Sequence, residues 1–333
     1  MGGGPSTPAL AAAVSGAGGL GFLAAGYRTP EAVREDIREV RARTERPVGV
    51  NLFVPSPPGN VGESVERYAE ALRGEAERYG VALGDPRHDD DGWRDKLTLL
   101  AEERVAVVSF TFGCPEASIV DELRRAGAAV WVTVTTASEA VVAERAGADA
   151  LVVQGVEAGG HRASFDDDVP GDIGLLALVR LVAAAVDLPL VATGGIGDGR
   201  GVAAVLAAGA DAAALGTAFL LTPEAGTSPT HRGAVARDTP TALTRAFTGR
   251  TARGIVNRFL VEHDADAPSA YPQVHHLTAP MRAAARDAGD AEGFHLWAGQ
   301  AHALAEELPA ADLVRRLSED AHEALREALA RRG

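Results

Sequence analysis

The stretch RAGADALVVQ, residues 145–154, joins a predicted helix to a predicted buried strand through a glycine corner. Glycine is expected at the end of a helix because it adopts the left-handed conformation without steric cost. Similar corners recur as RAGA at residues 125–128 and AAGAD at residues 207–211, each between a helix-like run and an apolar run. Three equivalent corners indicate repeated βα units and favour a (β/α) barrel over an irregular α/β fold.

Apolar runs alternate with Ala-, Leu-, Arg- and Glu-rich runs on both sides of this stretch. Continuous apolar runs are typical of strands that are buried on both faces of a parallel sheet. We predict strands at residues 20–25, 48–54, 105–112, 129–135, 150–154, 188–193 and 212–219. A TIM barrel needs eight strands, so the sequence predicts an α/β fold, a TIM (β/α)8 barrel that lacks its first strand. The opening MGGGPSTP has the form of a strand-to-helix loop, and we expect the natural protein to begin upstream of Met1.

Two regions depart from the alternation. Residues 56–93 form a charged, helix-prone insertion, which could cover an active site or be a solvated excursion, and its acidic run HDDDG at residues 88–92 is expected to be solvated. Later segments are polar and helix-prone, with amphipathic patterns at residues 277–288 and 292–308 and a charged final helix at 311–332. We therefore predict a barrel over residues 1–222 and a helical C-terminal extension over residues 223–333 that packs on it.

Composition limits the possible partners and location. The 333 residues carry a net charge of −14, which disfavours nucleic acid and anionic membranes as partners. No apolar run approaches the roughly 20 residues of a membrane span. The single cysteine, Cys114, permits neither a disulfide framework nor a cysteine zinc site, and Lys96, the only lysine, lies in a polar segment. We expect a cytoplasmic protein, a monomer or a homodimer, that acts on small molecules.

The strand at residues 150–154 ends in Gln154 and opens into GVEAGGHR, residues 155–162. Barrel enzymes place their chemistry where strands end in such loops, and histidine has an unperturbed pKa close to neutrality. A lone loop histidine is usually an ordinary surface residue. The position of His161 at a strand's carboxyl end favours a catalytic role, with Gln154 under a cofactor ring and Gly159 bare so that the backbone can approach a ligand.

Two glycine-rich loops follow the last two predicted strands. TGGIGDGRG at residues 193–201 precedes a helix, and ALGT at residues 214–217 ends the next strand. Backbone amides and helix N-termini in such loops bind phosphate, and barrels frequently build a phosphate site after strands seven and eight. The glycines could instead serve only tight turns. Because these loops follow strands seven and eight if one strand is missing, phosphate binding is the favoured interpretation.

Metal binding and nucleophilic catalysis have little support. Glu157 and His161 are four residues apart, but the glycines between them argue against the helix that would align them. His275 and His276 are adjacent and should point apart. Cys114 has no basic neighbour in sequence to lower its pKa, and no nucleophile elbow is present.

Together these segments resemble the nitronate monooxygenase family, formerly called 2-nitropropane dioxygenases. The resemblance covers nearly the whole chain, and EAGGH at residues 157–161 is its fairly specific part. The other matching segments are MGG at 1–3, GGLG at 18–21, GVNLFVP at 49–55, FTFG at 110–113, GGI at 194–196, LGTAF at 215–219 and LWAGQ at 296–300.

The resemblance implies a TIM barrel that contains FMN. By match, Met1 and Gly2 would lie near the flavin, and Asn51 and Gln154 would bind its ring or ribityl region. The ribityl chain and phosphate would be held by Gly159, Gly194, Gly195, Leu215, Gly216 and Thr217.

The resemblance also implies the reaction. An alkyl nitronate would be oxidised through FMN by dioxygen to a carbonyl compound and nitrite. His161 would either remove the α-proton of the neutral nitroalkane or, protonated, hold the anion. Two alternatives remain. One is an FMN-dependent NAD(P)H enoyl-thioester reductase, because flavin-dependent enoyl reductases share EAGGH in looser form, and the other is a non-catalytic flavin- or phospholigand-binding barrel.

Overall fold

The computed structural model describes residues 1–57 and 62–331. Its central element is a curled parallel sheet of seven strands in the order β1-β2-β3-β4-β5-β7-β8. These strands are β1 (Gly21–Ala24), β2 (Val48–Phe53), β3 (Val107–Thr111), β4 (Ala129–Val134), β5 (Ala150–Gln154), β7 (Leu190–Thr193) and β8 (Ala212–Ala214). The predicted parallel α/β sheet is confirmed, and β1 and β8 are its edge strands.

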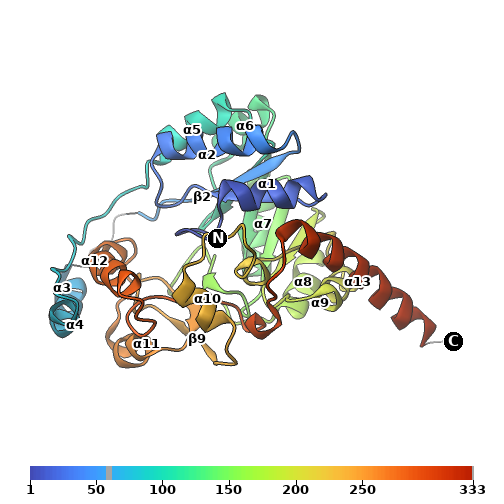
Figure 1. Ribbon diagram of the computed structural model, residues 1–333. Helices are drawn as coiled ribbons and strands as arrows, with labels where there is room; N and C mark the ends of the chain where they lie inside the picture. The colour runs from blue at the N-terminus through green and yellow to red at the C-terminus, as the bar shows by residue number, and fades with distance from the viewer. Residues whose placement is uncertain (58–61, 332–333) are drawn as a thin grey trace.

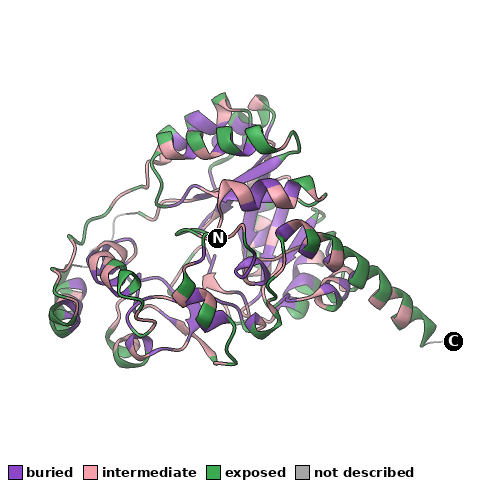
Figure 2. Cartoon of the chain, viewed as in Figure 1, coloured by how far each residue is buried: buried purple, intermediate pink, exposed green. Residues whose placement is uncertain are grey.

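Helices cover the outer face of this sheet, and the strands are largely buried (Figures 1 and 2). The covering helices are α1 (Pro8–Gly16), α2 (Pro30–Arg43), α5 (Trp93–Glu102), α6 (Ala117–Ala126), α7 (Ala137–Ala146), α8 (Leu175–Ala183) and α9 (Gly199–Ala207). Three glycines follow α6, α7 and α9 with φ angles of 97°, 92° and 105°, as the corner repeat predicts, namely Gly127, Gly147 and Gly209. The strands are rich in apolar side chains because they lie in the core, where Val108, Val130 and Val132 are fully enclosed.

The predicted strand at residues 212–219 is shorter than expected. The strand ends at Ala214, and Thr217–Phe219 forms a 3-10 helix. The turn between them brings Leu215 and Gly216 to the carboxyl end of the sheet.

The predicted amphipathic helix at residues 292–308 is wrong. Only His302–Leu304 is helical there, as a 3-10 turn, and Trp297 forms a β-bridge with Gly254. Gly293 and Gly299 interrupt the pattern, and glycine weakens a helix interior. A Cβ atom on Gly299 would lie 2.9 Å from the Glu157 carbonyl oxygen, so this segment packs flat against the barrel loop.

The predicted insertion packs against the region that follows residue 222. Its helices α3 (Gly62–Ala71) and α4 (Arg73–Arg78) lie beside α11 (Arg258–His263) and α12 (Gln273–Asp287) in Figure 1. The two regions share an apolar core that includes Tyr68, Phe247 and Met281. Residues 58–61 of the insertion lie outside the described part of the chain. Its described residues support α12 and, contrary to one expectation, contribute nothing to the lining of the main cavity.

The region after residue 222 is not only helical. A small antiparallel sheet has the order β6-β10-β9, with β6 (Gly160–His161), β9 (Thr241–Thr244) and β10 (Ala252–Ile255). α10 (Pro229–Val235) precedes β9, and the final helix α13 (Ala310–Ala330) packs on α9 and α1. Residue 332 of the predicted last helix is not among the described residues. Among those that are, no helix is both long and apolar enough to cross a bilayer.

Candidate active site

A cavity of about 580 Å³ opens at the carboxyl ends of the strands of the main sheet. Every residue predicted for the site lines it. These are Met1 and Gly2 at the N-terminus and, from the strand ends and the segments that follow them, Asn51, Gln154, Gly159, His161, Gly194, Gly195, Leu215, Gly216 and Thr217. The structure therefore brings together residues that are up to 216 positions apart in the sequence.

The glycine-rich loops form one end of this cavity. Gly194 and Gly195 have φ angles of 110° and 68°, a backbone conformation that other residues rarely adopt. Within the described part of the chain, the backbone N–H groups of Gly195, Gly216 and Thr217 donate to no protein acceptor. Free amides beside the start of α9 are the donor set that a phosphate group requires.

Gly159 lies where the barrel loop meets the segment around Gly299. A Cβ atom on Gly159 would lie 2.4 Å from the Gly299 nitrogen, which itself donates to Thr217 Oγ1 at 3.0 Å. The absence of a side chain at Gly159 is thus required by close backbone packing, a reason that sequence inspection did not supply.

Asn51 and the N-terminal residues lie along the floor of the cavity. The Asn51 amide nitrogen donates to Ser109 Oγ and to Thr111 Oγ1, each at 2.9 Å. Its Oδ1 atom accepts no hydrogen bond from the described residues, so it can accept one from a ligand. The Met1 side chain lies near Gly216, since a Cβ atom there would be 3.4 Å from Met1 Cγ.

Gln154 holds the histidine loop in place. Its amide nitrogen donates to the His161 carbonyl oxygen at 3.1 Å, and its Oε1 accepts from Arg162 Nη1 at 2.9 Å and from the Ala163 nitrogen at 3.0 Å. Arg162 is fully buried. Gln154 therefore lines the cavity and also fixes the backbone that carries His161.

His161 is held by a strand and not by a mobile loop. His161 lies in β6, where its backbone pairs with Ala252 of β10, and its Nε2 atom lies 2.9 Å from Thr248 Oγ1. Burial, together with Arg250 and Arg282, lowers the pKa of His161 from 6.5 to about 3. The imidazole is therefore neutral at physiological pH.

Comparison with known proteins places the chain in a family. Residues 1–320 match the family described as "Nitronate monooxygenase". The chain belongs to the nitronate monooxygenase family. A nitronate monooxygenase of Pseudomonas aeruginosa is 45% identical, over 95% of this chain and 93% of the relative. One of Paraburkholderia phytofirmans is 40% identical, over 95% of this chain and 89% of the relative.

Solved structures agree with this assignment to the nitronate monooxygenase family. A nitroalkane oxidase from Streptomyces ansochromogenes superposes with a TM-score of 0.95 at 54% identity, covering 99% of this chain and 95% of that one. FabK from Thermotoga maritima superposes with a TM-score of 0.77 at 29% identity, covering 98% and 92%. The predicted family, barrel-type fold and oxidoreductase class are confirmed, and the two alternative functions are not favoured.

An aromatic group around His161 completes this nitronate monooxygenase family site. The imidazole centroid lies 5.6 Å from that of Phe112, 5.5 Å from that of Trp297 and 6.0 Å from that of Tyr271. Phe112 and Trp297 lie in segments that match the family, whereas Thr248 and Tyr271 lie outside them and are not predicted from the sequence. No local pattern marks Thr248 or Tyr271, because each reaches His161 through the tertiary fold.

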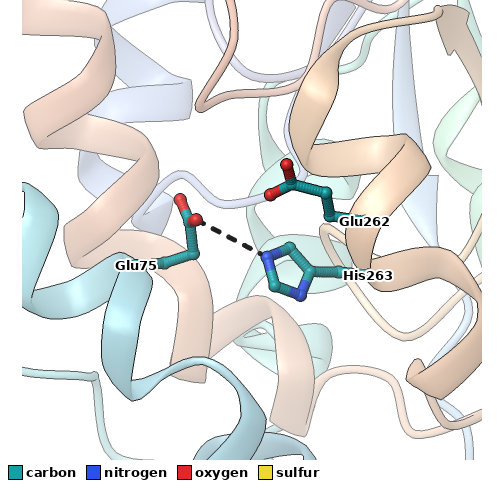
Figure 3. Close-up of side chains that lie close together, drawn as sticks. All are labelled: Glu75, Glu262 and His263. Atoms are coloured by element: carbon teal, nitrogen blue, oxygen red, sulfur yellow. Dashed lines mark ion pairs between the residues drawn. The ribbon is translucent and has the colours of Figure 1, made fainter.

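A cluster of possible metal ligands lies outside the set of residues that line the nitronate monooxygenase family site. Glu75, Glu262 and His263 approach one another closely enough to share an ion (Figure 3). However, Arg258 donates to both carboxylate oxygens of Glu75, at 2.6 and 2.8 Å, and to Glu262 at 2.5 Å. We therefore assign the cluster to an ion-pair network that joins α4 to α11.

Proposed function

We propose that this protein oxidises alkyl nitronates with dioxygen, through bound FMN, to carbonyl compounds and nitrite. The observation that carries the proposal is the placement of neutral His161 in one cavity with the unpaired backbone amides of Gly195, Gly216 and Thr217. The membership of the nitronate monooxygenase family supports the choice of substrate, since the relative from Pseudomonas aeruginosa is named for that reaction.

The residues that line the cavity fit FMN. The amides of Gly195, Gly216 and Thr217 would hold its phosphate, together with Gly194 and Leu215 of the same loops. Asn51, whose Oδ1 is free to accept a hydrogen bond, would hold the ring, with Met1, Gly2 and Gln154 beside it and Gly159 toward the ribityl chain. When bound, FMN supplies the electron transfer from nitronate and the reaction with dioxygen.

His161 acts as a proton acceptor in this proposal. Its pKa is lowered to about 3, so at pH 7 the imidazole is neutral and can accept the α-proton when the substrate arrives as the neutral nitroalkane. An alkyl nitronate has already lost that proton and needs no base. Holding an anion as imidazolium is the less favoured of the two expected roles, because burial and, to a smaller extent, Arg250 and Arg282 lower the pKa of His161 and oppose its protonation. Thr248 and the pairing of β6 with β10 keep the ring in position.

We extend the proposal to the organisation of the chain. Residues 1–222 would form the cofactor-binding barrel, and residues 223–333 would form an extension that closes one side of the cavity. A cytoplasmic location, and a monomer or homodimer as the working state, remain predictions from the composition. The partners would be a nitronate and dioxygen.

The visible absorption spectrum of the purified protein and a nitrite assay test the proposal. We expect a flavin spectrum that stays with the protein, and nitrite release from ethyl nitronate in air. NAD(P)H oxidation dependent on an enoyl thioester, without nitrite release, would instead support the reductase. Protein that neither contains flavin nor takes up FMN would support the non-catalytic barrel.

A further inference from the structure

Arg282 of α12 is a buried cation in the cavity wall without a carboxylate partner. Its side chain is 5% exposed, and it lines the same cavity as His161. Among the described residues, the charged or titratable groups that act on it most are Tyr27, Tyr271 and Arg286, none of which is acidic at neutral pH. Burial lowers the pKa of Arg282 only to about 10, so the guanidinium stays charged.

Arg282 fixes the hydrogen-bonding form of two histidines. Its Nη1 and Nη2 atoms lie 3.2 Å from the Nδ1 atoms of His295 and His275, and its Nε donates to Thr278 Oγ1 at 2.9 Å. A guanidinium can only donate, so both Nδ1 atoms accept. His275 and His295 are therefore neutral and carry their hydrogens on Nε2.

Among the described residues, the hydrogen bonds of the His275 and His295 rings are those at Nδ1, and neither Nε2–H group donates to a protein acceptor. Both imidazoles line the cavity, as does the guanidinium behind them. A buried charge without compensation is costly, and charge-assisted hydrogen bonds to an anion are among the strong ones. The cluster therefore has the chemistry of an anion site whose counter-ion comes from outside the protein.

The cluster lies toward His161 and not toward the phosphate loops. Gly299 contacts Thr217 at the phosphate end, and two residues earlier the Trp297 ring contacts both His161 and His295, with centroid distances of 5.5 and 5.0 Å. The Tyr271 ring likewise contacts both His161 and His275, at 6.0 and 6.3 Å. His295 in turn contacts Arg282. The anion bound here would therefore adjoin the catalytic histidine.

We propose that Arg282, His275 and His295 form an oxyanion subsite that binds the planar, negatively charged group of the nitronate and, after turnover, nitrite. This assignment deepens the proposed function and rests on it for the identity of the ligand. The guanidinium supplies the charge, and the two oriented Nε2–H groups supply direction. Neutral molecules of the same shape would bind less tightly.

Nitrate, a planar monovalent oxyanion, is the probe for this subsite. Isothermal titration into the FMN-loaded enzyme at constant ionic strength should show one site per chain, and nitrate should inhibit competitively against the nitronate. Arg282→Met should weaken nitrate binding roughly ten- to hundred-fold, the usual range for hydrogen bonds to a charged group. The exposed Arg38→Met is the matched control and should leave binding unchanged.

The variants also keep the assignment open to refutation. Arg282→Lys keeps the positive charge but loses the planar set of guanidinium N–H donors, so it should bind nitrate with intermediate affinity. It provides a second test if Arg282→Met does not fold. Nitrate affinity equal to wild type in a folded Arg282 variant would overturn the subsite. Loss of FMN from Arg282→Met, with no nitrate binding to loaded wild-type enzyme, would overturn it in favour of the FMN phosphate as ligand. Nitrate binding requires no turnover, so a protein that binds nitrate at Arg282 but releases no nitrite would refute the proposed function alone.

Discussion

The cavity has two walls that are built differently. The strand-end wall, which includes Asn51, Gln154 and Gly195, is positioned by the backbone pairing of the parallel sheet. The helical wall, which includes His275 and Arg282 of α12, is positioned by side-chain contacts with other segments, such as the stacking of Tyr27 on His275. A sheet edge gives a fixed frame for cofactor and catalyst, whereas side-chain contacts can change without disturbing that frame. We infer that the first wall determines the reaction and the second determines what binds.

A partly buried ion pair lies behind the helical wall. Lys96 is 1% exposed and lies 2.8 Å from Asp91, whose other oxygen accepts from the Tyr27 nitrogen at 3.0 Å. The Tyr27 ring stacks on His275 with centroids 4.1 Å apart. The expectation that the acidic run around Asp91 is simply solvated is therefore wrong at this residue, because Lys96 reaches it from inside the fold.

His161→Asn and His275→Asn compare the two walls directly. We expect His161→Asn to lower turnover of the neutral nitroalkane by about 10²–10⁴-fold, since it removes the proton acceptor, while FMN remains bound. His275→Asn should chiefly raise KM. Steady-state kinetics of both variants, with the flavin content measured in parallel, provide the test.

Two results would contradict this division. Equal losses of kcat in both variants would mean that the walls do not separate reaction from binding. If His161→Asn turns over the neutral nitroalkane as fast as wild type, His161 is not the proton acceptor.

Asp91→Asn and Lys96→Met test what holds the helical wall. Asp91→Asn leaves the Lys96 ammonium buried without a partner, and we expect it to lower the free energy of unfolding by about 3–5 kcal/mol. Lys96→Met should cost less, about 1–2 kcal/mol, because the remaining carboxylate of Asp91 is partly exposed and an apolar side chain of similar length fills the space. Chemical denaturation of both variants measures the difference. If both variants lose the same free energy of unfolding, the burial of an unpaired Lys96 ammonium is not the main reason why Asp91→Asn is destabilising.

The two walls also differ in how far the sequence predicts them. The strand-end wall follows from periodic signals, because a strand, a glycine corner and a loop recur, and parallel strands end at the same edge. The residues predicted for the site therefore reach one cavity. Neither Thr248 nor Arg282 has such a signal. Thr248 acquires its role from a contact with His161, 87 positions earlier, and Arg282 from a contact with His295, beyond the end of α12. The segment at residues 292–308 has an amphipathic pattern but forms no long helix, because its apolar side chains pack on the barrel loop instead.

Gly159→Ala tests the contact between the walls. The added Cβ atom would lie 2.4 Å from the Gly299 nitrogen and 2.5 Å from the Ala298 carbonyl carbon, so the backbone must shift. We expect a loss of about 1–3 kcal/mol in the free energy of unfolding and weaker FMN retention, measured by denaturation and by the fraction of flavin lost on dialysis. Gly233→Ala in α10, where a Cβ meets nothing within 4 Å, is the control and should be neutral or stabilising. Unchanged FMN retention in Gly159→Ala would show that the strand-end wall holds the cofactor without this contact.

Both walls also share a pH dependence of the free energy of unfolding. Burial lowers the pKa of His161 to about 3 and that of His275 to about 2, from 6.5. Below about pH 6.5 the unfolded chain therefore binds protons that the folded chain does not, so stability is full above pH 6.5 and falls as the pH falls toward 3. Each histidine contributes a slope of up to about 1.4 kcal/mol per pH unit. Denaturation at pH 7, 6 and 5 should show the stability difference between wild type and His161→Asn shifting against wild type at the lower pH, with a similar shift for His275→Asn. If the stability difference from wild type changes with pH for one variant and stays constant for the other, only the histidine replaced in the first variant is buried in its neutral form.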